Sequence, residues 1–229
     1  MLSVVIPTLN AGKILPQTLS ALVPGAVAGL VSQVIIADGG SGDNTHAVSD
    51  DAGCDWLNAP EGRGSQLAAA AELARGDWLL FLHADTVLSE GWIREVEHFI
   101  ERAERNDQTD RAAYFRFALD DLGGKARLLE KIVALRCALF ALPYGDQGLL
   151  IHKQTYRALG GFRSVPLMED VDLVRRVGRS RLYGLRTEAI TSAVRYRKNG
   201  FLPRMMRNIV CLSLYYLGVP PRHIKRLYG

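Results

Sequence analysis

Three short acidic segments, 38–45, 83–86 and 169–172, carry the side chains best suited to chemistry. A carboxylate can hold a hard divalent cation against substrate phosphates, and it can accept a proton as a general base. Each segment also has a purely structural explanation, as a turn or as the start of a helix. The case for chemistry therefore depends on whether the fold brings the three segments together.

The first segment, DGGSGDNT, directly follows an apolar run. Its glycines allow positive φ and close approach of the backbone to a ligand, while Asp38 could accept a hydrogen bond from a ribose or a base. Ser41 and Asp43 offer further polar groups. A turn in which Asp43 or Asn44 caps the next helix explains the segment equally well.

The same loop is compatible with another enzyme class. It lacks the GxGxxG spacing of a dinucleotide fold and the GxxxxGK[ST] spacing of a P-loop. An acid followed by Gly40 and Gly42 does resemble a methyltransferase loop, although Asn44 stands where a third glycine belongs. An S-adenosylmethionine-dependent methyltransferase is therefore the alternative enzyme.

Segments 83–86 and 169–172 also have both a chemical and a structural explanation. Asp85, in HADT, follows the apolar run 78–82, where a strand-end carboxylate could share a cation with substrate phosphates; a turn is the structural alternative. Glu169, Asp170 and Asp172 precede a predicted helix, whose dipole favours acids at its start. Three acids exceed what capping requires, so one of them could act as a general base.

Two arginines could contact phosphate with charge-assisted, bidentate hydrogen bonds. Arg63 lies between two glycines, and Arg195 precedes Tyr196. We expect most other arginines to be solvated at the surface.

Short apolar runs alternate with helix-length segments in the first half of the chain, which predicts βαβ units and a parallel sheet. The polar signatures follow the strands, at the edge where open α/β sheets bind ligands. The predicted strands are 2–6, 31–37, 54–57 and 78–82, and the predicted helices are 12–22, 44–52 and 65–75. Further along, we predict a helix over 89–105, a strand over 112–119 and a partly buried helix over 124–142.

Composition and length indicate one globular domain. The chain has 229 residues, of which 48% are hydrophobic and 23% charged, and it contains no repeat or linker. Its three cysteines are isolated and form no metal-ligand spacing. Because no signal peptide is visible, we expect a cytoplasmic protein.

Charge is segregated along the chain. The net charge is +4, but residues 173–229 carry +12 and residues 1–172 carry −8. The apolar run 209–219 is shorter than the roughly 20 residues of a spanning helix. Its basic flanks could contact the inner face of a membrane, but burial in protein explains the run at least as well, so we predict a soluble protein. No nucleic-acid partner is expected.

Together these features resemble the family-two glycosyltransferases with a GT-A fold. The resemblance extends from SVVIPTLN at 3–10 through the acidic segments to EDVD, about residues 1–180. It implies a single α/β domain with a mostly parallel central sheet flanked by helices and a Rossmann-like N-terminal half. Its expected parts are a nucleotide-sugar-binding half at 1–118, an acceptor and catalytic half at 119–200, and a basic helical tail at 201–229. Segment 191–196 and the tail look like a short bacterial subgroup associated with radical-SAM, selenium or arsenosugar proteins.

The resemblance also implies roles for individual residues. Asp170 matches the catalytic base beside Glu169, and Asp85 matches the metal-binding acid of the DxD motif, with Mn²⁺ or Mg²⁺ as cofactor. The implied donor-binding residues are Pro7, Thr8, Asn10, Asp38, Ser41, Asp43, Arg63, His83, Ala84 and Arg195. Asp38 would contact the nucleotide base, and Arg195 the diphosphate.

The chain departs from the family pattern in two places. His83 replaces the first Asp of DxD, which puts a ribose contact in doubt, and no QxxRW motif exists, which argues against a processive polysaccharide synthase. The implied reaction is an inverting transfer from a nucleotide-diphosphate sugar, such as a UDP-sugar, to a small-molecule or lipid-linked acceptor. A nucleotide-sugar-binding protein without turnover is the alternative outside the enzymes.

Overall fold

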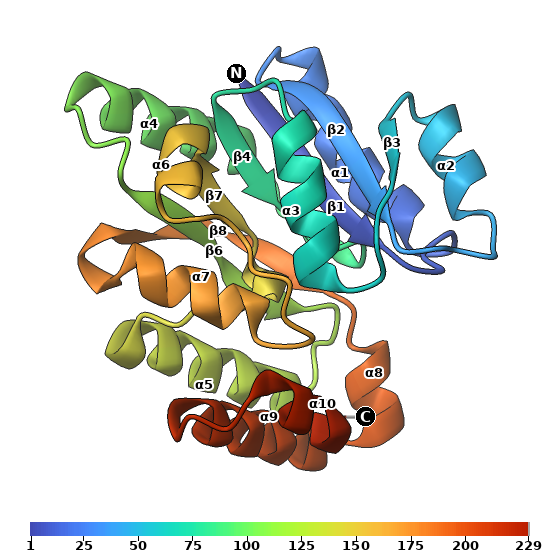
Figure 1. Ribbon diagram of the computed structural model, residues 1–229, viewed down its shortest axis with the longest axis vertical. Coiled ribbons are helices and arrows are strands. Elements are labelled where there is room, and N and C mark those ends of the chain that lie inside the picture. The colour runs from blue at the N-terminus through green and yellow to red at the C-terminus, as the bar shows by residue number, and fades with distance from the viewer. Residues whose placement is uncertain (229) are drawn as a thin grey trace.

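A single mixed sheet with helices on both faces forms the centre of the molecule (Figure 1). The computed structural model describes residues 1–228, without the side chains of Arg195, Lys198, Asn199 and Tyr228. The strands are β1 Leu2–Thr8, β2 Val31–Asp38, β3 Asp55–Asn58, β4 Trp78–Phe81, β5 Thr86–Leu88, β6 Ala112–Leu119, β7 Leu149–His152 and β8 Leu182–Thr191. The α-helices are α1 Leu15–Val27, α2 Thr45–Asp51, α3 Arg63–Leu73, α4 Trp92–Arg105, α5 Gly124–Phe140, α6 Lys153–Ala158, α7 Glu169–Val177, α8 Val194–Asn199, α9 Phe201–Tyr216 and α10 Pro221–Tyr228. Two 3-10 turns, η1 Gly145–Gln147 and η2 Arg179–Arg181, complete the described elements.

The strand order explains the Rossmann-like character of the N-terminal half. The sheet runs β3-β2-β1-β4-β7-β6-β8-β5. Its first four strands are mutually parallel, so the ends of β1, β2 and β4 meet at one edge. β7 is inserted antiparallel between β4 and β6, whereas β6 and β8 are parallel. The predicted mostly parallel α/β sheet is confirmed.

Neighbouring residues of the central strands pack on opposite faces of the sheet. Val4 belongs to a core with α1 and α4, and Val5 to a core with α3 and α7, and both are fully buried. Because side chains alternate along a strand, β1 must be apolar throughout to fill both cores. This double coverage is why the N-terminal strands could be predicted as continuous apolar runs.

The predicted elements of residues 1–142 are all present, with ends shifted by a few residues. For example, the helix predicted at 12–22 lies at 15–27, and the helix predicted at 65–75 lies at 63–73. The acids of segment 169–172 occupy the first turn of α7, as predicted. β5, β7 and β8 were not predicted, and all three lie next to the site described below.

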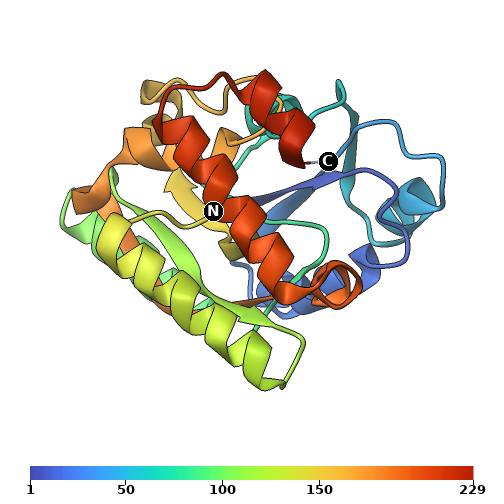
Figure 2. The ribbon, with the colours of Figure 1, turned by 90° about the horizontal axis from the view of Figure 1, so that it is seen from below.

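The C-terminal helices α9 and α10 pack together with α5 at one end of the molecule (Figure 2). One side of α9 faces the protein, where Cys211 is fully buried, while Ile209 and Val210 on the other side are about half exposed. Burial in protein therefore explains only one side of this apolar run. Among the described residues, no helix is long and apolar enough to cross a membrane.

Candidate functional site

The loops after β1 and β2 are tied together at the carboxyl edge of the sheet. Thr8 Oγ1 donates to Asp38 Oδ1 at 2.9 Å, and the Gly39 amide donates to the Thr8 carbonyl at 2.9 Å. The Gly40 and Ser41 amides donate to Asp38 Oδ2 at 2.9 and 2.6 Å, and the Ser41 hydroxyl donates to Oδ1 at 2.5 Å. The buried carboxylate of Asp38 thus accepts four hydrogen bonds from its own surroundings.

These bonds decide the charge state of Asp38. Burial by itself would raise its pKa, but the hydrogen bonds from Ser41, Thr8 and Gly40 outweigh burial and hold the pKa below its usual value. The carboxylate is consequently an anion that organises the loop. Its predicted contact with a nucleotide base would have to compete with these donors.

Asn10 and Asp43 make further hydrogen bonds between the loops after β1 and β2. The Asn10 amide donates to Ser41 Oγ at 2.7 Å, and Asn10 Oδ1 accepts from the Gly42 amide at 2.9 Å. Asp43 accepts from the Gly12 amide and from the amide of Thr45 at the start of α2, both at 3.0 Å. The predicted helix-start role of Asp43 is therefore present, and both residues shape the loops in this structure.

A second cluster forms where α3 and α7 begin. Arg63, the first residue of α3, lies 3.2 Å from the buried carboxylate of Glu169, the first residue of α7. Burial and the neighbouring charge of Asp170 raise the pKa of Glu169, and Arg63 opposes them. This ion pair joins two segments that the sequence analysis had considered separately.

Asp170 is held by backbone groups. Its Oδ2 accepts from the Gly145 amide and its Oδ1 from the Val171 amide, both at 2.7 Å. His83 lies on the other side of Gly145: a Cβ added to this glycine would come within 2.6 Å of His83 Nε2. Turn η1 therefore passes between His83 and Asp170 with no room for a side chain.

Asp146, in η1, is the functional candidate that the sequence analysis missed. Its Oδ1 is buried and has no hydrogen-bond partner among the described residues. Burial raises its pKa to about 6, opposed by Arg136 and reinforced by Asp170 and Asp85. The only available signal was an acid between glycines in GDQG, a pattern like that around Asp38.

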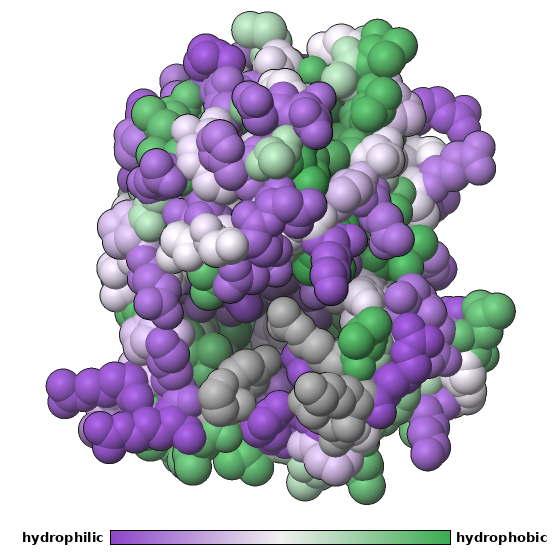
Figure 3. Space-filling model, turned by 90° about the vertical axis from the view of Figure 1, so that its right-hand side faces the viewer, coloured by the Kyte–Doolittle hydropathy of each residue, from purple (hydrophilic) through white to green (hydrophobic). Residues whose placement is uncertain are grey.

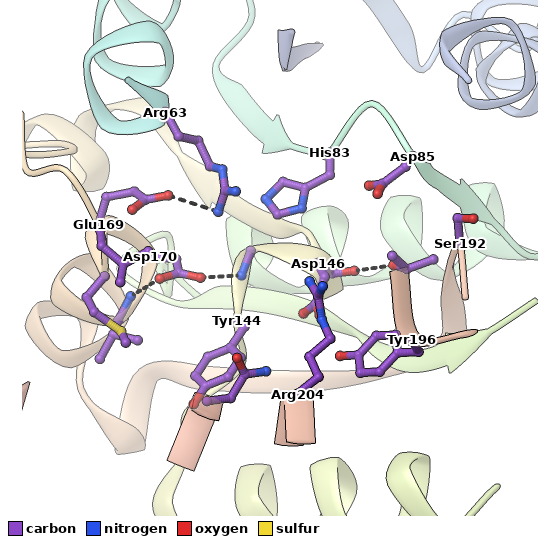
Figure 4. A pocket seen from close by; sticks show the side chains of 16 residues that line it. Arg63, His83, Asp85, Tyr144, Asp146, Glu169, Asp170, Ser192, Tyr196 and Arg204 are labelled. Atoms are coloured by element: carbon purple, nitrogen blue, oxygen red, sulfur yellow. Dashed lines mark hydrogen bonds and ion pairs between the residues drawn. The ribbon is translucent and has the colours of Figure 1, made fainter. Parts of the chain in front are cut away.

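These side chains line one cavity (Figure 4). Asp85 and His83 enter it from the end of β4, Asp146 from η1, and Glu169 and Asp170 from the start of α7. The remaining wall is formed mainly by Tyr144, Leu167, Met168, Ser192, Tyr196, Arg204 and Asn208. The structure thus brings together Arg63, His83, Asp85, Glu169 and Asp170 around one cavity.

A second cavity adjoins the first, and the residues that line both form their shared border: Arg63, His83, Asp85, Leu167 and Glu169. Pro7, Thr8 and Ala84 line it, together with Leu9, Ala11, Ile14, Glu61, Gly62, Gln66 and Lys225. Asn10, Asp38, Ser41 and Asp43 line neither cavity. Figure 3 shows a hollow near the middle of one face of the molecule, with mainly hydrophilic residues along its upper border.

Two further predicted features of the site are the diphosphate contact of Arg195 and the metal ion. The side chain of Arg195, predicted to contact a diphosphate, lies outside the described residues. No group of three or more His, Cys, Asp or Glu side chains within the described part of the chain is close enough to hold a metal alone.

Comparison with known families decides the class of protein. The family model described as glycosyl transferase family 2 matches residues 3–122, slightly more than half of the chain. The chain belongs to glycosyl transferase family 2. This membership overturns the methyltransferase alternative and confirms the predicted family. The match ends before Asp146, Glu169 and Asp170, whose roles therefore depend on geometry.

Solved structures confirm a GT-A glycosyltransferase fold along nearly the whole chain. Glucosyl-3-phosphoglycerate synthase from Mycobacterium tuberculosis, in complex with Mn²⁺, UDP and glucosyl-3-phosphoglycerate, is similar with a TM-score of 0.62 at 19% identity, covering 96% of this chain and 81% of that one. The same enzyme with Mg²⁺ and UDP gives a TM-score of 0.64 at 18% identity, with 96% and 80% coverage. Mannosyl-3-phosphoglycerate synthase from Rubrobacter xylanophilus gives 0.60 at 17% identity, with 96% and 75% coverage.

No curated protein matches the chain, so no comparison tests the radical-SAM, selenium or arsenosugar subgroup. The identities to the solved structures are low enough that the likeness concerns the fold alone.

Proposed function

We propose that this glycosyltransferase moves a sugar from a nucleoside-diphosphate donor, best a UDP-sugar, to the hydroxyl of an acceptor, with inversion at the anomeric carbon. The observation that carries the proposal is the convergence of Asp85, Asp146 and Asp170 on one cavity bordered by Arg63. Solved structures with the same fold contain UDP together with Mn²⁺ or Mg²⁺, which supports this donor class.

The donor would span both cavities. Its nucleoside would lie in the second cavity, against the Pro7 and Thr8 wall at the ends of the parallel strands, where open α/β sheets bind nucleotides. Its diphosphate would then reach the shared border, where Arg63 can donate charge-assisted hydrogen bonds. The sugar would enter the first cavity beside Asp170. The proposed division into a donor half at 1–118 and an acceptor half at 119–200 follows this placement.

A divalent cation fits the carboxylates at the border. The buried Oδ1 of Asp146 has no hydrogen-bond partner among the described residues, and Asp85 acts on the same carboxyl electrostatically. Asp85 and Asp146 would hold Mn²⁺ or Mg²⁺, which supplies charge stabilisation for the departing diphosphate. Because His83 stands where the family pattern has an acid, the site offers the cation fewer carboxylates. The cation would therefore take more of its ligands from the donor phosphates.

Asp170 would accept the proton of the acceptor hydroxyl. Two backbone amides fix its position, and a carboxylate has about four acceptor sites, so about two remain for substrate. Glu169, the buried acid next to Asp170, is paired with Arg63 and so is not an isolated charge beside the proposed base. The reaction is then one in-line displacement, in which the acceptor oxygen bonds to the anomeric carbon as the bond to the diphosphate breaks.

The decisive experiment is a thermal-shift and calorimetric screen of nucleotide sugars with and without Mn²⁺, because a ligand that binds only the folded state raises its stability by mass action. We expect a UDP-sugar to bind with Mn²⁺, and S-adenosylmethionine to have no effect. Release of UDP on adding a pool of small metabolites would separate an enzyme from a sugar-binding protein without turnover. Absence of binding by every nucleotide sugar would refute the proposal.

A further inference from the structure

The wall of the first cavity opposite the donor border is built by α9. Arg204 and Asn208 are one helical turn apart on this helix, which places them on the same side, and both line the cavity. Arg204 extends toward Asp146 in Figure 4, with its guanidinium 4.8 Å from the centre of the Tyr196 ring. The acidic cavity therefore receives a cation from a distant part of the chain.

Both side chains carry unused hydrogen-bonding capacity. Arg204 Nε and Asn208 Oδ1 are buried, and neither has a hydrogen-bond partner among the described residues. Buried polar atoms in native proteins are normally paired, so two such atoms on one wall indicate a ligand or ordered water. A guanidinium donates to carboxylate or phosphate oxygens, while the Asn208 oxygen accepts from a hydroxyl or an amine.

The position of the wall separates it from the donor. Arg204 and Asn208 do not line the nucleoside cavity, whereas Lys225 of α10 does. The other cation of the first cavity, Arg63, lies at the shared border and pairs with Glu169. A molecule held by Arg204 would thus lie in the first cavity, which Asp170 also lines.

We propose that Arg204 and Asn208 form the acceptor subsite, and that the acceptor is a small hydroxylated anion, a carboxylate or a phosphate ester. Arg204 binds the anionic group, Asn208 accepts from a hydroxyl, and another hydroxyl is directed to Asp170. This inference rests on the proposed glycosyl transfer and deepens it by naming the class of acceptor. It also gives the basic C-terminal tail a place in the active site.

The test uses probes of this chemistry on the full-length chain. Glycerate and glycerol 3-phosphate, with neutral glycerol as control, are titrated calorimetrically into protein saturated with UDP and Mn²⁺, and into protein without either. We expect an anionic probe to bind where glycerol does not. Arg204→Met should weaken it by about 10- to 100-fold, the loss expected for charge-assisted hydrogen bonds. The preferred probe shows whether the subsite takes carboxylate or phosphate.

Arg222→Met is the matched control, because it removes one charge from an exposed position on α10 that lines neither cavity. It should leave probe affinity unchanged, and Asn208→Ala should weaken the probe by about 5-fold, as for a neutral hydrogen bond. Far-ultraviolet circular dichroism and melting temperature establish that each variant folds.

Three results would overturn the inference: no anionic probe binds the wild type, Arg204→Met keeps full probe affinity, or Arg204→Met loses UDP affinity instead. The last result would reassign Arg204 to the diphosphate. If UDP fails to bind the wild type, the proposed function fails, and the titration without nucleotide still decides whether the anion subsite exists.

Discussion

The backbone amide of Gly145 donates a hydrogen bond of 2.7 Å to Oδ2 of Asp170, across 25 residues of sequence. This contact joins η1 to the start of α7 and directs the carboxylate toward the cavity that also contains Asp85 and Asp146. It depends on a residue without a side chain, because His83 occupies the space on the other side of Gly145.

Asp170→Asn should lower the rate of acceptor-dependent UDP release by about 10²- to 10⁴-fold, the usual contribution of a general base. Donor affinity, measured by calorimetry with UDP and Mn²⁺, should stay nearly unchanged, because the proton taken belongs to the acceptor. Asp172→Asn is the control: it removes a charge two residues later that pairs with Arg163 and Arg176. The control should lose stability but keep its rate per folded molecule. Normal turnover by Asp170→Asn would exclude the role.

Gly145→Ala should disrupt the site by adding a side chain at the turn whose amide binds Asp170. The new Cβ would lie 2.6 Å from His83 Nε2 and 3.4 Å from Asp170 Oδ2, so the imidazole or the turn must move. We expect UDP release to fall at least about 10-fold, because small displacements in an active site are costly. The free energy of unfolding should fall by about 1–3 kcal/mol from overpacking.

Gly124→Ala is the matched control for Gly145→Ala, because no atom lies within 4 Å of its added Cβ and its φ is not positive. It should change neither the rate nor the stability appreciably. Equal activity of the Gly145 and Gly124 variants would show that the contact with His83 is unimportant.

Asp85→Asn tests the cation. UDP binding to the wild type should tighten when Mn²⁺ is added and weaken again with a chelator, whereas the variant should bind UDP equally with and without the metal. Glu90→Gln, a nearby exposed acid that lines neither cavity, serves as the charge-matched control. Retained stimulation by Mn²⁺ in Asp85→Asn would assign the cation to other ligands.

Asp38→Ala separates a loop-organising role from direct contact with a nucleotide. The change leaves the Thr8 hydroxyl and the Gly40 and Ser41 amides without their acceptor, which should cost about 3 kcal/mol of unfolding free energy. Ser41→Ala removes one of the donors and should cost about 1 kcal/mol. Both are measured by urea unfolding. Unchanged stability of Asp38→Ala together with lost UDP binding would favour the base contact over the loop.

The N-terminal half could be predicted because its strands are buried on both faces, so their sequences are continuously apolar. β8 could not, since its buried residues, Leu185, Ala189 and Thr191, follow neither a continuous nor a strictly alternating pattern. The strand also includes Arg186 and Glu188. β7, a four-residue strand, lies beyond the first half of the chain, where apolar runs alternate with helix-length segments, so no such alternation marked it as a strand. Without β7 between β4 and β6, nothing in the sequence places Asp146 near Asp85.

The residues of the candidate site likewise fall into those that could be grouped from the sequence and those that could not. Asp85 follows an apolar run and Asp170 lies at the start of a predicted helix, and the sequence resemblance assigns both to one site, so their grouping could be anticipated. The Arg63–Glu169 pair joins residues 106 positions apart in the numbering, and the Arg204 wall depends on how α9 docks beneath the sheet. Such contacts are set by tertiary packing, which local sequence periodicity does not encode.

Asp146 should give the protein without metal a distinctive dependence of stability on pH. Burial, together with Asp170 and Asp85, raises its pKa from 3.8 to about 6, against the effect of Arg136. Between these values the unfolded chain has released the proton that the folded protein retains. Folding therefore takes up a proton, so unfolding free energy falls as the pH rises from about 4 to about 6 and stays lower above it. A shift of about two units corresponds to roughly 3 kcal/mol.

Asp146→Asn keeps the size of the side chain and removes the titration. In urea unfolding with a chelator present, we expect the variant to be more stable than the wild type at pH 7.5, by up to about 3 kcal/mol. The advantage should shrink below about pH 6 and vanish below about pH 3, where the wild-type carboxyl is protonated in both the folded and the unfolded state. Asp50→Asn, at an exposed position on α2, is the control and should differ little from the wild type in stability at pH 7.5. If Asp146→Asn is instead less stable than the wild type at pH 7.5, the ionised carboxylate makes a stabilising contact in the protein itself, and its unpaired oxygen no longer indicates a cation site.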